Sequence, residues 1–85
     1  MKAMGDLENA KVLMEEALAG KRTTLGNDHP STLTSIDNMG GLLQAMGDLE
    51  NAKVLYEEAV SGARKVLGGR HPHTNIFAQN LSSCS

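Results

Sequence analysis

The chain has 85 residues, with ten acidic and eight basic side chains, a formal net charge of −2 and 40% hydrophobic residues. This length accommodates one small domain, whose thin core leaves little room for an enclosed active-site cleft. The near-neutral charge gives no electrostatic footprint for nucleic acid or an anionic membrane surface. Cys84 is the only cysteine, which excludes an internal disulfide framework and favours a cytoplasmic location.

The sequence repeats itself with a period of 42 residues. Residues 3–13 recur letter for letter as residues 45–55, and the Leu-Gly and His-Pro pairs near residue 30 recur at the same spacing near residue 70. A fixed period of this size is typical of stacked repeat arrays, in which each unit buries an apolar face against its neighbours. We therefore expect a single repeat domain over residues 1–85.

Two helices are expected in the first period. The first spans residues 6–24, where apolar side chains recur at the i, i+3, i+4 and i+7 positions of one helical face. The loop that follows contains Gly26, Asn27 and Asp28. Pro30 then begins the second helix, over residues 30–45, because its φ angle is preset for a helix start.

The second period is expected to repeat this pair. The third helix spans residues 48–66, with Asp48 as its N-cap and Arg64 and Lys65 at its C-terminal end. The fourth begins at Pro72, repeats the second helix and runs to about residue 82. The sequence therefore predicts an all-α protein with four helices, at about 6–24, 30–45, 48–66 and 72–82.

Small residues lie where two antiparallel helices must approach closely, at Gly40, Ala52 and Ala59, with Tyr56 between the two alanines. This spacing resembles the tetratricopeptide repeat. The ordinary repeat has about 34 residues, and the longer period here is similar to the kinesin light chain type. The resemblance implies an antiparallel helix-pair solenoid, with helices in the order B-A-B-A, that acts as a protein–protein interaction scaffold and not as an enzyme.

In that family, helix A lines the concave face of the solenoid and contacts an extended peptide of a partner protein. Carried over position by position, the resemblance implies a peptide-binding groove formed by Thr34, Asp37, Asn38, Gly41, Gln44, Ile76, Gln79, Asn80 and Ser83. Asn38 and Asn80 are repeat-equivalent, and an Asn side chain can both donate to and accept from the backbone of a bound strand. The alternative is that these two residues only hold loop or neighbouring-helix contacts.

The nine groove residues include no Lys or Arg, so the groove does not suit a peptide that is held by its carboxylate. Asp37 favours a neutral or a basic peptide instead. This is the chemistry that we expect of the partner segment.

The phase of the repeat gives a second hypothesis. The chain starts with a helix B and finishes with a helix A, and these two helices are complementary. We expect a homo-oligomer through the terminal helices, either an open head-to-tail stack or a symmetric dimer. The alternative function is therefore a self-assembling structural element, and the remaining alternative is a fragment that is stable as a monomer.

Other residue patterns predict no chemistry. His29 and His71 precede Pro and mark the start of a helix, and a metal site would need three or four convergent ligands. The paired glutamates fit a solvated helix face, and no nucleophile–base pair is recognisable. We expect no metal, no cofactor, no nucleic-acid or membrane partner and no enzymatic activity.

Overall fold

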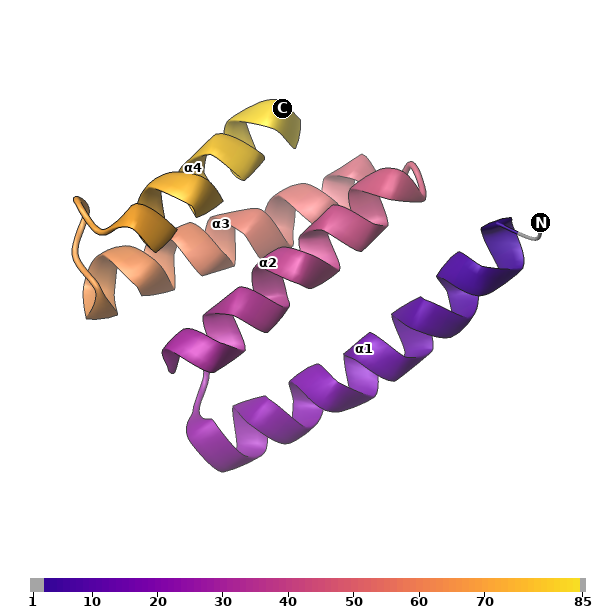
Figure 1. The fold of residues 1–85 in the computed structure, drawn as a ribbon, viewed down its shortest axis with the longest axis horizontal. Helices are drawn as coiled ribbons and strands as arrows, with labels where there is room; N and C mark the ends of the chain where they lie inside the picture. Colours follow the sequence, from indigo (N-terminus) through magenta and orange to yellow (C-terminus); the bar gives the residue numbers. More distant parts are fainter. Residues whose placement is uncertain (1–2, 85) are drawn as a thin grey trace.

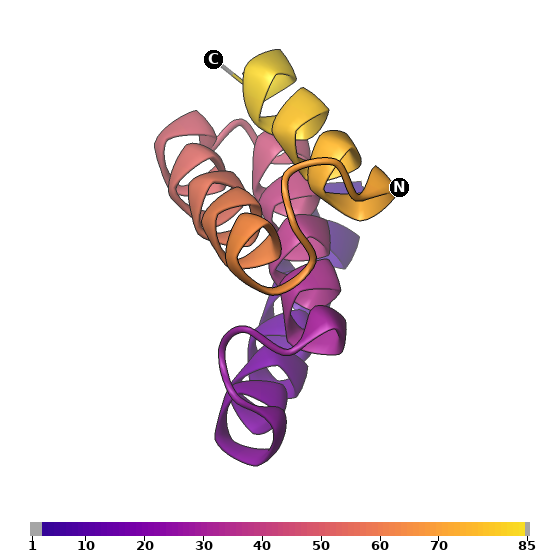
Figure 2. The ribbon, with the colours of Figure 1, turned by 90° about the vertical axis from the view of Figure 1, so that its left-hand side faces the viewer.

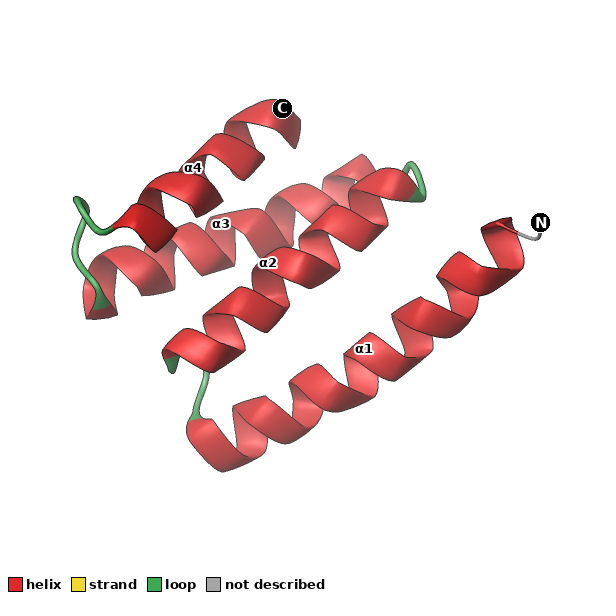
Figure 3. Cartoon of the chain, viewed as in Figure 1, coloured by secondary structure: helices red, strands yellow, loops and turns green. Residues whose placement is uncertain are grey.

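A computed structural model describes residues 3–84 of the chain, and the side chains from residue 6. Residues 1, 2 and 85 of the expected domain lie outside the described residues. The described chain forms four helices and no strand (Figures 1 and 3): α1 Ala3–Leu25, α2 Pro30–Ala45, α3 Leu49–Val66 and α4 Pro72–Cys84. The predicted all-α class and its four helices are confirmed.

Two glycines follow the ends of α1 and α3 and start the loops to α2 and α4. Gly26 follows α1 with a φ of 95°, and Gly68 lies at the equivalent place after α3 with a φ of 92°. Only glycine adopts this left-handed conformation without a steric cost. The backbone N–H of each then donates back to the last turn, to Lys21 and to Ala63 respectively, which satisfies helix-end carbonyls.

Four helix ends differ slightly from the sequence-based bounds, and one of them is the end of α1, at Leu25 instead of residue 24. Helix α1 begins at Ala3 instead of residue 6, and α3 begins at Leu49 because Asp48 is its N-cap, with Oδ1 3.4 Å from the Asn51 N–H that it accepts. Helix α4 continues to Cys84 instead of ending at residue 82. Cys84 is only 8% exposed and its Sγ lies 3.5 Å from the carbonyl oxygen of Leu49, so packing against the start of α3 extends the helix.

Each helix packs against the next one in the chain, and α2 also touches α4 (Figures 1 and 2). Helix α2 packs most extensively against α3, then α3 against α4 and α1 against α2. We call α1 and α3 the B helices and α2 and α4 the A helices, because each pair is repeat-equivalent. The arrangement brings the two A helices side by side.

The core runs through all four helices. Leu33 and Ile36 of α2 are fully buried at its centre, and removing side chains of this size from water stabilises the fold by about 1.5–3 kcal/mol each. Around them lie Leu18 of α1, Ala59, Val60 and Ala63 of α3 and Phe77 of α4. A second cluster beside it contains Met39, Leu43, Ala52, Tyr56 and Cys84.

Candidate functional site

The nine residues predicted to form the groove all lie on the two A helices. Thr34 to Gln44 belong to α2, and Ile76 to Ser83 belong to α4. We call these nine residues the helix-A face. Because α2 and α4 touch each other, the structure brings both halves of the predicted set onto neighbouring helices.

The two A helices begin with the same histidine cap. His29 is the N-cap of α2, and its Nδ1 accepts the Ser31 N–H at 3.1 Å. His71 repeats this arrangement before α4, where its Nδ1 accepts the His73 N–H at 3.1 Å. Each imidazole satisfies one backbone donor that a helix start leaves without a partner. The His-Pro pairs therefore mark helix starts, as the sequence indicated.

Asp37 and Asn80 join the two A helices directly. The Asn80 amide Nδ2 donates to both carboxylate oxygens of Asp37, at 3.1 and 3.0 Å. Asp37 is only 9% exposed, and this desolvation raises the pKa of its carboxyl group, while the hydrogen bond from Asn80 opposes the shift. Asp37 is thus held between helices, and a ligand at the surface has little access to it.

Gln44 is engaged in a second contact between helices. Its Oε1 accepts a hydrogen bond of 2.9 Å from the hydroxyl of Tyr56 on α3. The Tyr56 ring lies against Gly40, where a Cβ atom would come within 2.8 Å of the ring. Burial raises the pKa of the Tyr56 hydroxyl, which keeps it a donor. Sequence reasoning identified Tyr56 as a packing residue but gave no signal for its bond to Gln44.

Most of the remaining helix-A face is open to solvent. Gly41 is partly buried, and the exposed members are Thr34, Asn38, Ile76, Gln79 and Ser83. The Thr34 hydroxyl donates to the Pro30 carbonyl within its own helix, and Ile76 is 50% exposed. The two repeat-equivalent asparagines therefore differ: Asn80 makes the neighbouring-helix contact given above as the alternative, while Asn38 remains exposed.

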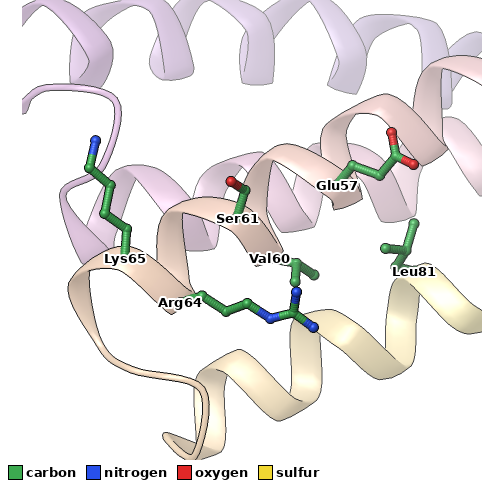
Figure 4. Close-up of a pocket in the computed structure, with 6 residues that line it drawn as sticks. All are labelled: Glu57, Val60, Ser61, Arg64, Lys65 and Leu81. Carbon is green, nitrogen blue, oxygen red and sulfur yellow. The ribbon is translucent and has the colours of Figure 1, made fainter.

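Two grooves lie outside the helix-A face, and no sequence pattern indicated either of them. The central groove, of about 290 Å³, is formed by Lys11, Glu15, Leu18, Met39, Leu43, Asp48, Asn51, Val54 and Leu55. The C-terminal groove, of about 480 Å³, lies between α3 and α4 and is lined by Glu57, Val60, Ser61, Arg64, Lys65 and Leu81 (Figure 4). Their depth depends on side-chain sizes across several helices, which a one-dimensional pattern does not give.

Residues 3–84 contain no group of three or more His, Cys, Asp or Glu side chains that could hold a metal ion. His71 and His73 are neighbours, with ring centroids 5.3 Å apart. None of the described helices is long and apolar enough to cross a membrane.

The helix pairs, their 42-residue period and the shared caps define an all-α helical repeat protein. A tetratricopeptide repeat family model matches residues 1–65, and the chain belongs to this family. Members of the family generally mediate protein–protein interaction and are typically scaffolds without enzymatic activity. No curated protein matches the sequence.

Proposed function

We propose that this chain binds an extended, uncharged peptide segment of a partner protein across the helix-A face. The Asp37–Asn80 contact carries the proposal, because it joins α2 directly to α4, and these are the two helices that carry the helix-A face. The 42-residue period further supports a scaffold of the kinesin light chain type.

The exposed residues of this face suit a peptide backbone. Asn38 and Gln79 each present an amide that can donate and accept, and one extended strand offers both N–H and C=O groups along its length. Half-exposed Ile76 lies on the same helix as Gln79 and offers apolar contact to a side chain of the peptide. None of the nine residues is cationic, so a terminal carboxylate has no partner here.

The test is selection from a random-peptide display library, followed by calorimetric titration of the selected peptides. We expect the double variant Asn38→Ala, Gln79→Ala to weaken binding about tenfold, or about 1.4 kcal/mol. Asn75→Ala is the matched control, because Asn75 is also exposed on α4 but does not belong to the helix-A face. Helicity of each variant is checked by circular dichroism.

Two results would overturn the proposal. One is a library that yields no peptide with measurable affinity. The other is a selected peptide whose affinity falls equally in the Asn75→Ala control and in the double variant.

One observation favours a second candidate function, self-association through the terminal helices. Helix α3 buries Ala52, Tyr56 and Ala59, whereas at the equivalent positions of α1 Ala17 is exposed and Ala10 and Met14 are only partly buried. A face that one repeat buries is therefore open in the other. Light scattering behind size exclusion, over a wide range of protein concentration, tests this candidate, and a mass that stays at 9.0 kDa throughout rejects it.

A further inference from the structure

The C-terminal groove is the starting point, because only two helices form it. Its residues come from α3 and α4. In Figure 4, Arg64 extends from α3 over the space between these helices, near Val60 and opposite Leu81. The groove has no third wall among the described residues.

The central groove has three walls and is the comparison that shows what the C-terminal groove lacks. Its residues come from α1, α2 and α3. Moving 42 positions along the chain converts Glu15 into Glu57, Leu18 into Val60 and Met39 into Leu81, and all three of these equivalents line the C-terminal groove. The two grooves are therefore repeat-equivalent, and the C-terminal one is wider because it lacks the wall that α3 provides in the central one.

The residues that form the third wall of the central groove have equivalents elsewhere in the chain. In the central groove α3 contributes Asn51, Val54 and Leu55. The same three residue types lie 42 positions earlier on α1, as Asn9, Val12 and Leu13. Val12 and Leu13 are 51% and 65% exposed. Helix α1 of one copy thus has the same residues, at the same spacing, as the wall that would complete the C-terminal groove of another copy.

We propose that a second copy of this chain docks head to tail, with its α1 packed against α4 and placed beside α3 of the first copy, as α3 is packed against α2 and placed beside α1. The inference rests on the proposed self-association and specifies its register. The contact joins two different surfaces of the chain, so each end of the assembly keeps one unused surface. Further copies can therefore be added, which gives an open stack.

An ion pair between B helices supports this register. Arg22 of α1 donates to both carboxylate oxygens of Glu58 on α3, at 2.6 and 2.9 Å. Arg64 on α3 lies 42 positions after Arg22, and Glu16 on α1 lies 42 positions before Glu58; both are exposed. Neither forms an ion pair within the described chain. In the proposed register Arg64 of one copy meets Glu16 of the next, which repeats a two-point guanidinium–carboxylate contact.

The close packing of Gly40 against Tyr56 is also compatible with this register. Within the chain, the Tyr56 ring leaves no space for a side chain at Gly40. At the junction Ser82 takes the place of Gly40, and Met14 takes the place of Tyr56. A residue that has a Cβ therefore faces a narrower, flexible side chain, and the two substitutions compensate for each other.

The junction buries less apolar surface than the contact within the chain. Leu33 and Ile36 of α2 are fully buried, and their equivalents on α4 are Asn75, which is exposed, and Ala78. Because buried apolar area drives association, we expect contact between copies to be weaker than packing between α2 and α3, and therefore reversible on dilution.

Sedimentation velocity over a range of concentrations, with a reducing agent present, tests the register through charge reversal. Glu16→Arg places two cations together at the junction, and Arg64→Glu places two anions there. We expect each single variant to associate about tenfold more weakly than the parent chain. The double variant should regain the parent behaviour. Both positions are exposed, and circular dichroism verifies that each variant folds.

Mixing the two single variants gives the sharpest result. Every junction between a Glu16→Arg chain and an Arg64→Glu chain pairs a cation with an anion, whichever chain comes first, whereas a junction between two copies of the same variant is repulsive. The mixture should therefore regain association as an alternating stack, while each variant alone remains weak. A mixture that associates no better than its components overturns the register, and so does a single variant that associates at the parent's strength. A parent chain that stays monomeric at every concentration overturns both the register and self-association.

A variant that restores apolar contact supplies an independent measurement. Asn75→Leu recreates the side chain that Leu33 places against Gly62, now against Gly20 of the next copy, and should strengthen association. Thr24→Leu adds the same side chain on α1 and is the matched control, because Thr24 and its repeat-equivalent Val66 are both exposed. Equal strengthening by both variants indicates non-specific adhesion and overturns the proposed register.

Discussion

Asn80 of α4 donates its Nδ2 amide to both carboxylate oxygens of Asp37 on α2, at 3.1 and 3.0 Å. The two residues are 43 apart in the sequence, one more than the repeat period, so the contact joins adjacent positions on successive A helices. Because Asp37 is nearly buried, its carboxylate loses hydrogen bonds to water, and the hydrogen bonds from Asn80 replace them. The pair thus fixes the spacing of the two helices on which the proposed peptide-binding surface depends.

Asn80→Ala should lower the free energy of unfolding by about 1–3 kcal/mol, because it leaves a largely buried carboxylate without its donor. Urea denaturation at neutral pH measures the change. Asn38→Ala is the control, since Asn38 is the repeat-equivalent residue but is exposed, and its effect should stay within about 0.5 kcal/mol. Equal effects of the two substitutions would show that the Asp37 contact adds no stability.

The stability of the chain should depend on pH through Asp37. Burial raises the pKa of this carboxyl group in the folded state, so the folded chain binds the proton more tightly than the unfolded chain does. The resulting stabilisation is complete below the ordinary Asp pKa of about 4 and is lost as the pH rises through the raised value.

Asp37→Asn removes this titration and isolates it from the other carboxylates. The free energy of unfolding of the parent chain, minus that of the variant, should decrease as the pH rises from acidic to neutral. Urea denaturation at a series of pH values gives this difference. A difference that increases with pH would mean that the hydrogen bond from Asn80 outweighs desolvation.

The helices and the members of the helix-A face could be predicted from the sequence because they depend on local signals. Apolar residues recur with the helical period, Pro30 and Pro72 mark two helix starts, and a repeat of 42 residues carries any position from one A helix to the next. The resemblance to the tetratricopeptide repeat, which implies the fold, rests on these patterns and on the Gly40–Tyr56 spacing.

The interactions of individual groove residues could not be predicted in this way. The Asp37–Asn80 contact depends on a one-residue stagger between two helices that are not consecutive in the chain, and helical periodicity says nothing about this stagger. The bond from Tyr56 to Gln44 depends on how closely α3 approaches α2. The resemblance therefore assigns Asp37, Asn80 and Gln44 to a ligand, whereas the structure shows them bonded to neighbouring helices.

His29→Ala should destabilise the chain by about 0.5–2 kcal/mol, the usual effect of losing an N-cap acceptor. The His29 Nδ1 accepts the Ser31 N–H at the start of α2, and Ala has no group that replaces it. His29→Asp should restore stability, because a carboxylate accepts the same N–H and interacts favourably with the helix dipole. Thermal unfolding followed by circular dichroism compares the three chains. If His29→Ala unfolds at the parent's temperature, the cap makes no contribution.

Gly40→Ala should destabilise the chain although Ala favours helix formation more than Gly does. The added Cβ would lie 2.8 Å from Cε1 of Tyr56, and this ring cannot move away easily because it is buried and its hydroxyl is bonded to Gln44. Overpacking of this kind costs about 1–3 kcal/mol, against a helix-propensity gain of about 1 kcal/mol. Gly20→Ala is the matched control: it lies in α1 with no atom near the added Cβ, so we expect it to increase stability.

A double variant separates the steric clash from other effects of Gly40→Ala. Tyr56→Met shortens and loosens the opposing side chain, as Met14 does at the equivalent position of α1. On its own it should destabilise the chain, because it removes the ring and the bond to Gln44. Combined with Gly40→Ala it should cost less than the sum of the two single changes, since the clash is gone. Urea denaturation of the four chains completes this double-mutant cycle, and strictly additive losses would show that Tyr56 is not what excludes a side chain from position 40.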